Sequence, residues 1–243
     1  GDWLRGPWDI VARLGDALRS DWGAGDGGVA SPLPSTVHVA NSDRIHVGRS
    51  CAFQGPCVLD ASEGPIFIDE GVRVGAFAVI EGPCFIGRES RINAHAWLHG
   101  PNFIGPLCKI GGEIDGCVFQ GHANKQHAGF LGHSYVASWV NLGAGTSNSD
   151  LKNTYGSVRV RVADAEVDTG CQFFGAIIAD HAKTGINTAI PTGATLGFAS
   201  MAASGGLIPK SLPAFAWLTE RGLTPGDPLR LLEVADKVMA RRQ

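Results

Sequence analysis

The densest group of side chains that could take part in chemistry lies at residues 122–156, with the sequence HANKQHAGFLGHSYVASWVNLGAGTSNSDLKNTYG. It contains three histidines, two lysines and several asparagines. An imidazole titrates near neutral pH, so a well-placed histidine can accept a proton from a reacting group. Asparagine amides and lysine ammonium groups can orient a polar or anionic ligand. The group therefore predicts a site for proton transfer, provided that the fold brings these side chains together.

The elements that must position this group follow a strict six-residue period. A helix has a period near 3.6 and a simple sheet a period of two, so neither produces it. A β-sandwich of short strands would not keep it either. A coil of short strands does, with three hexads to one triangular turn and one aliphatic side chain per hexad pointing inward. The uninterrupted run is Ile68, Val74, Ile80, Ile86, Ile92, Leu98, Ile104 and Ile110.

The fifth position of each hexad supports this interpretation, because a crowded interior requires small side chains there. These positions are Val72, Ala78, Cys84, Ser90, Ala96, Asn102, Cys108 and Ile114. The period continues with slips in both directions, so we expect about eight turns over roughly 150 residues. The further inward positions are Val47, Phe53, Leu59, Val118, Asn124, Phe130, Val136, Leu142, Ile178, Thr184, Ile190 and Leu196.

Composition narrows the class of protein. The chain has 243 residues, of which 44% are hydrophobic and 18% charged, as in globular proteins. A net charge of −3 offers no electrostatic attraction to nucleic acid. No apolar run reaches the ~18 residues of a membrane span and no signal peptide opens the chain, so we expect a cytoplasmic protein. Four of the six cysteines (Cys51, Cys57, Cys84 and Cys108) fall on fifth positions and predict small core residues rather than disulfides or zinc ligands.

Other elements are expected at both ends and at one interruption. Residues 7–22 have the pattern of an amphipathic helix, and a glycine-rich linker follows at 23–28. The polar stretch 147–156 leaves the repeat, as an insertion or a binding loop does. Residues 228–242 predict a second helix with an apolar stripe. The expected division is an amino-terminal helix and linker at 1–36, a repeat domain of coiled short strands at 37–208 and a carboxy-terminal extension with a helix at 209–243.

Two stretches resemble a known family: NKQHAGFLGHSYV at 124–136 and VNLGAGTSNSDLKNTYG at 140–156. They are similar to the catalytic-histidine and VN(I/L)GAGT segments of left-handed β-helix acyltransferases. The resemblance is greatest to the glucosamine-1-phosphate N-acetyltransferase domains of bifunctional N-acetylglucosamine-1-phosphate uridylyltransferases, over roughly residues 40–210. It implies an all-β solenoid, a left-handed parallel β-helix with short helices at both ends, that forms a homotrimer with active sites between subunits. The handedness comes from the resemblance alone, because parallel crossovers are normally right-handed.

The resemblance also implies an acetyl-CoA-dependent N-acetyltransferase of an amino sugar, such as glucosamine 1-phosphate or a related sugar phosphate or nucleotide sugar. His127 falls where the family has its general base. The implied substrate-binding residues are Asn124, Lys125, Phe130, Asn141 and Lys152. The implied cofactor-binding residues are Ala144, Gly145, Lys183, Asn187, Ser204 and Lys210. Small residues allow the acyl thioester to approach the backbone, and lysines can pair with phosphates. Each also has a structural alternative, such as an asparagine ladder between coils or a solvated lysine.

Departures from the family pattern leave other functions open. Phe130 stands where the family typically has tyrosine, and Asp115 lies near the expected position of a lysine that binds the sugar phosphate. One alternative is a non-catalytic trimerisation or regulatory domain of a sugar-phosphate nucleotidyltransferase. Another is a metal-dependent hydratase, although acyl transfer itself needs no metal. Its candidate ligands are His95, His122, His127 and His133.

No nucleotide-binding loop with a βαβ pattern is present, and the chain begins with Gly1 rather than Met. We therefore expect either the carboxy-terminal part of a longer enzyme or a single-function relative.

Overall fold

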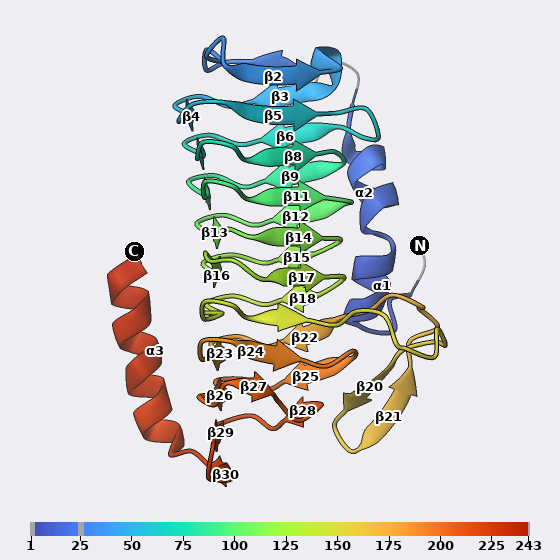
Figure 1. Cartoon of the computed structure of the whole chain (residues 1–243), viewed down its shortest axis with the longest axis vertical. Helices are drawn as coiled ribbons and strands as arrows, with labels where there is room; N and C mark the ends of the chain where they lie inside the picture. The colour runs from blue at the N-terminus through green and yellow to red at the C-terminus, as the bar shows by residue number, and fades with distance from the viewer. Residues whose placement is uncertain (1–2, 24–26, 243) are drawn as a thin grey trace.

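The polypeptide coils into a parallel β-solenoid of about 11 turns, shown in Figure 1 by a computed structural model that describes residues 3–23 and 27–242. Short strands stack along three faces, and each strand pairs in parallel with the strands one turn before and after it. This confirms the expected all-β, left-handed parallel β-helix of hexapeptide repeats.

Face A is a ten-stranded sheet that runs the length of the solenoid. Its strands are β1 (Gly28–Val29), β3 (Ile45–Val47), β6 (Ile66–Ile68), β9 (Cys84–Ile86), β12 (Asn102–Ile104), β15 (Val118–Phe119), β18 (Tyr135–Val136), β22 (Ala176–Ile178), β25 (Ala194–Leu196) and β28 (Ser211–Leu212).

Face B is a six-stranded sheet followed by a three-stranded one. Its strands are β2 (Val37–Ala40), β5 (Cys57–Asp60), β8 (Val79–Glu81), β11 (Trp97–His99), β14 (Glu113–Asp115), β17 (Phe130–Gly132), β19 (Ser147–Asn148), β24 (Thr188–Ile190) and β27 (Gly206–Leu207). A 3₁₀ turn, η1 (Ser42–Arg44), links β2 to β3.

Face C is likewise built of two sheets, which isolated bridges at Asn141 join into one surface. Its strands are β4 (Ala52–Phe53), β7 (Arg73–Val74), β10 (Arg91–Ile92), β13 (Lys109–Ile110), β16 (Asn124–Lys125), β23 (Lys183–Thr184), β26 (Met201–Ala202) and β29 (Ala216–Thr219). β30 (Gly222–Pro225) pairs with β29 in antiparallel fashion.

The six-residue repeat forms the core as predicted. All eight aliphatic residues from Ile68 to Ile110 are completely buried. The residues at the fifth positions between them are completely or almost completely buried. The polar members of that set are satisfied by backbone partners: Ser90 Oγ donates to the Gly105 carbonyl, and Asn102 Oδ1 accepts from the Cys117 N–H. The stacked hexads therefore bury one continuous apolar column.

The described cysteines are all free thiols, in agreement with their predicted role as small core residues. Cys57, Cys84 and Cys108 are buried, whereas Cys51 is only half-buried. Burial raises the pKa of the Cys84 and Cys108 thiols to about 12, because desolvation disfavours the thiolate. These thiols therefore stay protonated and inert at neutral pH.

The predicted inward register is wrong between β15 and β17. Two sides of the triangle, from Ile110 to Ile114 and from Ile114 to Phe119, are shorter than six residues. The next inward residue is therefore Phe119, one position after the predicted Val118. The buried inward residues are therefore Phe119, Lys125 and Leu131, rather than Val118, Asn124 and Phe130. Val136 and Leu142 point inward as expected.

The number of turns also differs from the expected value of about eight. Parallel pairing begins at β1 and continues to β28 and β29, so the solenoid extends past residue 208. Sides shorter than six residues also place more turns in the same length of chain. Side length depends on how each coil packs on its neighbour, which the six-residue period does not encode.

Helices cover two faces of the solenoid (Figure 1). The single helix expected at 7–22 is two helices, α1 (Pro7–Ala12) and α2 (Leu14–Asp21), that lie along face A. Of the linker expected at 23–28, residues 24–26 lie outside the described residues, and Gly28 begins β1. None of the described helices is long and apolar enough to cross a membrane.

The predicted carboxy-terminal helix is present as α3 (Pro228–Arg242), which stands beside face C (Figure 1). Leu231 and Ala235, from the predicted apolar stripe, are buried, whereas Val234 and Val238 are half-buried.

The excursion that begins after β19 is longer than the sequence indicates. It contains an antiparallel hairpin, β20 (Arg159–Val162) and β21 (Ala165–Asp168), before the chain rejoins face A at β22. Val158, Val160 and Phe174 pack the excursion against Trp8 of α1, so the insertion and the amino-terminal helix share a small second core.

Candidate active site

The corner between faces C and B gathers the predicted base and four of the predicted cofactor-binding residues on successive coils. Stacked backbone hydrogen bonds align these coils: the Gly145 N–H donates to Ala128 O (3.1 Å) and the Asn187 N–H to Ala144 O (2.7 Å). The Gly206 N–H then donates to Asn187 O at 2.8 Å. We call this edge the His127 corner. Its predicted members are His127, Ala144, Gly145, Asn187 and Ser204.

His127 lies on the turn between β16 and β17 with an exposed side chain. In the described part of the chain its imidazole has no hydrogen-bond partner, so both ring nitrogens are available to a ligand. Its carbonyl oxygen accepts a hydrogen bond from Lys125 Nζ, which fixes the turn from the inside of the solenoid.

Lys125, predicted to bind substrate, lies inside the solenoid and not on its surface. Its side chain is completely buried on the solenoid axis beside Ile110, and Nζ donates to Gly111 O at 3.1 Å as well as to His127 O. Desolvation lowers the pKa of this lysine to about 8. The side chain therefore cannot touch a ligand on the surface, and its contacts are those of a group that positions His127.

Asn124 and Asn141 lie on the outer side of face C, one coil apart, and the amide oxygen of Asn124 accepts a hydrogen bond from Arg242 Nη2 at 2.9 Å. The end of α3 reaches them: Arg242 Nη2 donates to Asn141 Oδ1 at 3.0 Å, and Nη1 donates to His122 O at 2.6 Å. Sequence reasoning missed Arg242, since nothing in a helix pattern indicates that its last turn returns to a coil more than a hundred residues earlier.

The remaining predicted residues are dispersed around the corner. Phe130 lies on the outer side of face B, and its N–H donates to Ser147 Oγ at 3.1 Å. Lys152 is in the excursion, where Nζ donates to Ser157 O at 2.9 Å. That contact ties the ammonium group to its own loop rather than leaving it free for a substrate.

Neither lysine proposed to bind coenzyme A phosphates lies on the His127 corner. Lys183 is on face C, where burial lowers its pKa and Nζ donates to His181 O at 2.9 Å. Lys210 is exposed on the turn from β27 to β28, at the far edge of face B. The spacing along the chain did not reveal which corner each lysine would occupy.

The four histidines of the hydratase alternative are also separated within one chain. His95 and His127 lie on the edge between faces C and B, His122 on the edge between A and C, and His133 on the edge between B and A. His122 stacks on Trp139 with ring centroids 3.9 Å apart. One described chain therefore does not bring three of these imidazoles together.

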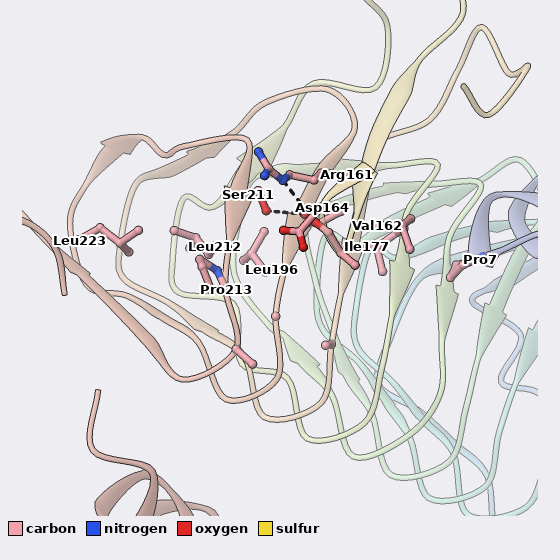
Figure 2. Close-up of a pocket in the computed structure, with 15 residues that line it drawn as sticks. Pro7, Arg161, Val162, Asp164, Ile177, Leu196, Ser211, Leu212, Pro213 and Leu223 are labelled. Atoms are coloured by element: carbon pink, nitrogen blue, oxygen red, sulfur yellow. Dashed lines mark hydrogen bonds between the residues drawn. The ribbon is translucent and has the colours of Figure 1, made fainter. Parts of the chain in front are cut away.

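A hollow of about 720 Å³ lies elsewhere, under the β20–β21 hairpin against face A (Figure 2). Leu196, Leu212 and Leu223 give it a mainly apolar lining, and its charged side chains are Arg161 and Asp164. No predicted site residue lines it, and it holds no pairing of a nucleophile with a base. The predicted site residues therefore lie along an edge of the solenoid and not in this hollow.

Comparison with known proteins supports the resemblance of the sequence. No protein-family model matches the chain. Over 91 residues it is 34% identical to a bifunctional sugar-1-phosphate nucleotidylyltransferase/acetyltransferase of Sulfurisphaera tokodaii. The match covers 37% of this chain and only 23% of that relative's length.

Solved structures with a similar outline include a putative acetyltransferase of Bacillus cereus, at a TM-score of 0.40 and 13% identity over 79% of this chain and 94% of that one. A UDP-N-acetylglucosamine acyltransferase gives a TM-score of 0.36 and 13% identity over 84% and 77%. Likenesses this distant indicate neither substrate nor activity.

Proposed function

We propose that the protein is an acetyl-CoA-dependent N-acetyltransferase whose acceptor is an amino sugar, either glucosamine 1-phosphate or a related sugar phosphate or nucleotide sugar. The observation that carries the proposal is the His127 corner. An exposed imidazole stands one coil from the small Ala144–Gly145 turn, and Asn187 and Ser204 continue the same edge. The acetyltransferase named among the relatives supports the same chemistry.

In the proposed reaction the acceptor amine attacks the thioester carbonyl of acetyl-CoA, an amide bond forms, and coenzyme A leaves as its thiol. His127 takes the proton that the attacking amine must lose. The Ala144 N–H donates to no group in the described chain, so it is available to the thioester oxygen as negative charge develops there. Asn141 and Asn124 would orient the acceptor, and Asn187 and Ser204 the pantetheine amides.

We further propose that the chain acts as a homotrimer. Face C carries an exposed column of Arg73, Arg91 and Lys109, in register on adjacent strands and without an ion pair in the described chain. The outer side of face B carries Glu81 and Glu113, among other acids. Packing face B of one copy against face C of the next joins opposite charges, and three such contacts close a ring.

The test is acetyl transfer from acetyl-CoA to a panel of amino sugars, measured as released thiol, for the wild type and His127→Ala. We expect the substitution to lower kcat by about 10²–10⁴ while acetyl-CoA still binds. His95→Ala is the matched control, because that imidazole lies on the same edge, two coils away, and stacks on Phe77. It should stay within a few-fold of wild type.

Two other results would change the conclusion. Activity in His127→Ala equal to wild type would remove the assignment of the base. No thiol release with any acceptor, together with no acetyl-CoA binding, would leave the solenoid as a trimerisation or regulatory domain of a nucleotidyltransferase.

A further inference from the structure

A cluster of imidazole and carboxylate groups lies on the edge between faces B and A, away from the His127 corner. Asp115 ends β14, His133 follows β17, and Asp150 begins the excursion. One carboxylate oxygen of each aspartate and one ring nitrogen of His133 all lie within 4.8 Å of one another. His133 Nδ1 is 2.8 Å from Asp150 Oδ2. Three successive coils thus bring three donor atoms close together.

Glycines on neighbouring coils leave the space that the cluster occupies. A Cβ atom at Gly132 would clash with Asp150 Oδ2 and with the Phe130 ring, and one at Gly116 would lie 3.0 Å from the His133 ring. Gly116 has a positive φ of 62°, which favours glycine by itself. The backbone at Gly132 has no such requirement, so its missing side chain is explained by the room that the Asp150 carboxylate and this ring need.

The charges of the cluster are unbalanced. In the described chain neither Asp115 nor Asp150 forms an ion pair with a lysine or arginine. Their partners are imidazoles: His133 faces Asp150, and His99 Nδ1 lies 3.9 Å from Asp115 Oδ1. A cation at this point would offset both carboxylates.

We propose that Asp115, His133 and Asp150 bind one divalent transition-metal ion of the Zn²⁺ or Mn²⁺ class. Imidazole nitrogen with carboxylate oxygen is a donor set that these ions accept. Ligands about 2.0–2.2 Å from one ion can lie up to about 4 Å apart, so small side-chain rotations would close the 4.8 Å spread.

Binding would replace the hydrogen bond between His133 and Asp150 and would attach the start of the excursion to β14. The cluster lies on the edge between faces B and A and contains no residue of the His127 corner.

The experiment is a competition titration. Protein freed of metal by a chelator is titrated with Zn²⁺, and separately with Mn²⁺, in the presence of a chromophoric chelator. We expect one ion per chain and a higher thermal unfolding temperature with the ion bound. Asp150→Asn and His133→Gln should each weaken affinity at least about tenfold, since even outer partners of metal ligands contribute that much. Glu166→Gln, which removes an exposed acid from the same excursion, is the matched control and should bind as wild type does.

Cobalt(II) distinguishes this site from the six cysteines of the chain. A Co²⁺ spectrum without a sulfur-to-metal charge-transfer band is expected; a strong band would assign the ion to thiolates and overturn the proposal. Wild-type protein that binds no stoichiometric ion would also overturn it, as would His133→Gln and Asp150→Asn proteins with wild-type affinity. Circular dichroism checks that each variant folds. If one of the two variants is unfolded, the metal affinity of the other variant tests the proposal.

Discussion

Lys125 carries an ionisable ammonium group that is buried in the apolar interior of the solenoid. It occupies an interior position beside Ile110 that other coils fill with aliphatic side chains, and in the described chain two backbone carbonyls receive its ammonium protons. Burying a charge without a counter-ion destabilises the fold, so its retention there requires a compensating role. The contact with His127 O supplies one, because it holds the turn that presents the proposed base.

Replacement of Lys125 by methionine should remove a pH dependence of stability. The folded-state pKa of about 8 lies below the usual 10.5, so between these values the unfolded chain binds more protons than the folded one. The free energy of unfolding of the wild type should therefore rise, relative to Lys125→Met, as pH increases from 8 towards 10.5. The gain is on the order of 3 kcal/mol at most, at 1.36 kcal/mol per pKa unit.

Urea denaturation of both proteins at pH 7 and pH 9.5 measures this difference. If the free energy of unfolding changed equally with pH in both proteins, the lowered pKa of Lys125 would be contradicted. If Lys125 positions His127, the variant should also lose kcat with little change in the KM for acetyl-CoA, whereas a purely structural lysine would leave kcat unchanged in folded protein.

At the scale of the elements, the hexad is the unit that stabilises the solenoid. β10 shows both sides of the pattern, since Ile92 is completely buried and its neighbour Arg91 is exposed. Each coil is held by the coils on either side, so a defect in one inward residue is felt by three turns.

Ile92→Ala should therefore lower the free energy of unfolding by about 2–5 kcal/mol, through lost apolar burial and an unfilled cavity. Arg88→Ala, at an exposed arginine of the same coil that lies outside the proposed subunit contact, should change it by no more than about 0.5 kcal/mol. Chemical denaturation followed by circular dichroism compares the two. Equal effects would mean that the period does not separate inward from outward positions.

The elements also show where a periodic pattern loses information. The repeat correctly identified the inward residues along the unbroken run of hexads from Ile68 to Ile110. From Ile110 to Leu131 the sides vary, and the pattern then assigned Asn124 inward and Lys125 outward, the reverse of what the coils adopt. Side length is decided by packing against adjacent coils, which a single sequence does not display.

At the scale of the whole molecule, the faces of the prism differ in what they offer a second copy. Face A is covered by α1 and α2, whereas the upper parts of faces B and C present columns of opposite charge. This asymmetry suits a closed ring in which each copy uses two different faces.

Arg91→Glu should weaken the trimer about tenfold or more, because it places a negative charge against acidic side chains of the neighbouring copy. Sedimentation equilibrium at low salt measures the association. Arg88→Glu, an exposed arginine on the edge between faces A and C, carries the same change of charge and should leave assembly intact. A wild type that remains monomeric at all concentrations would exclude the ring.

The sequence by itself determined the solenoid and most of its interior, because a six-residue period fits a coil with three short sides per turn and most inward positions are apolar. The resemblance of two stretches indicated the segment that carries the proposed base. Only the tertiary structure decided which distant residues meet. Arg242 reaches Asn141 because α3 folds back along face C, and Asp150 meets His133 and Asp115 because the excursion leaves at the edge where β14 and β17 end. Such contacts depend on the path of a helix or loop across the coils, for which the period of the repeat carries no signal.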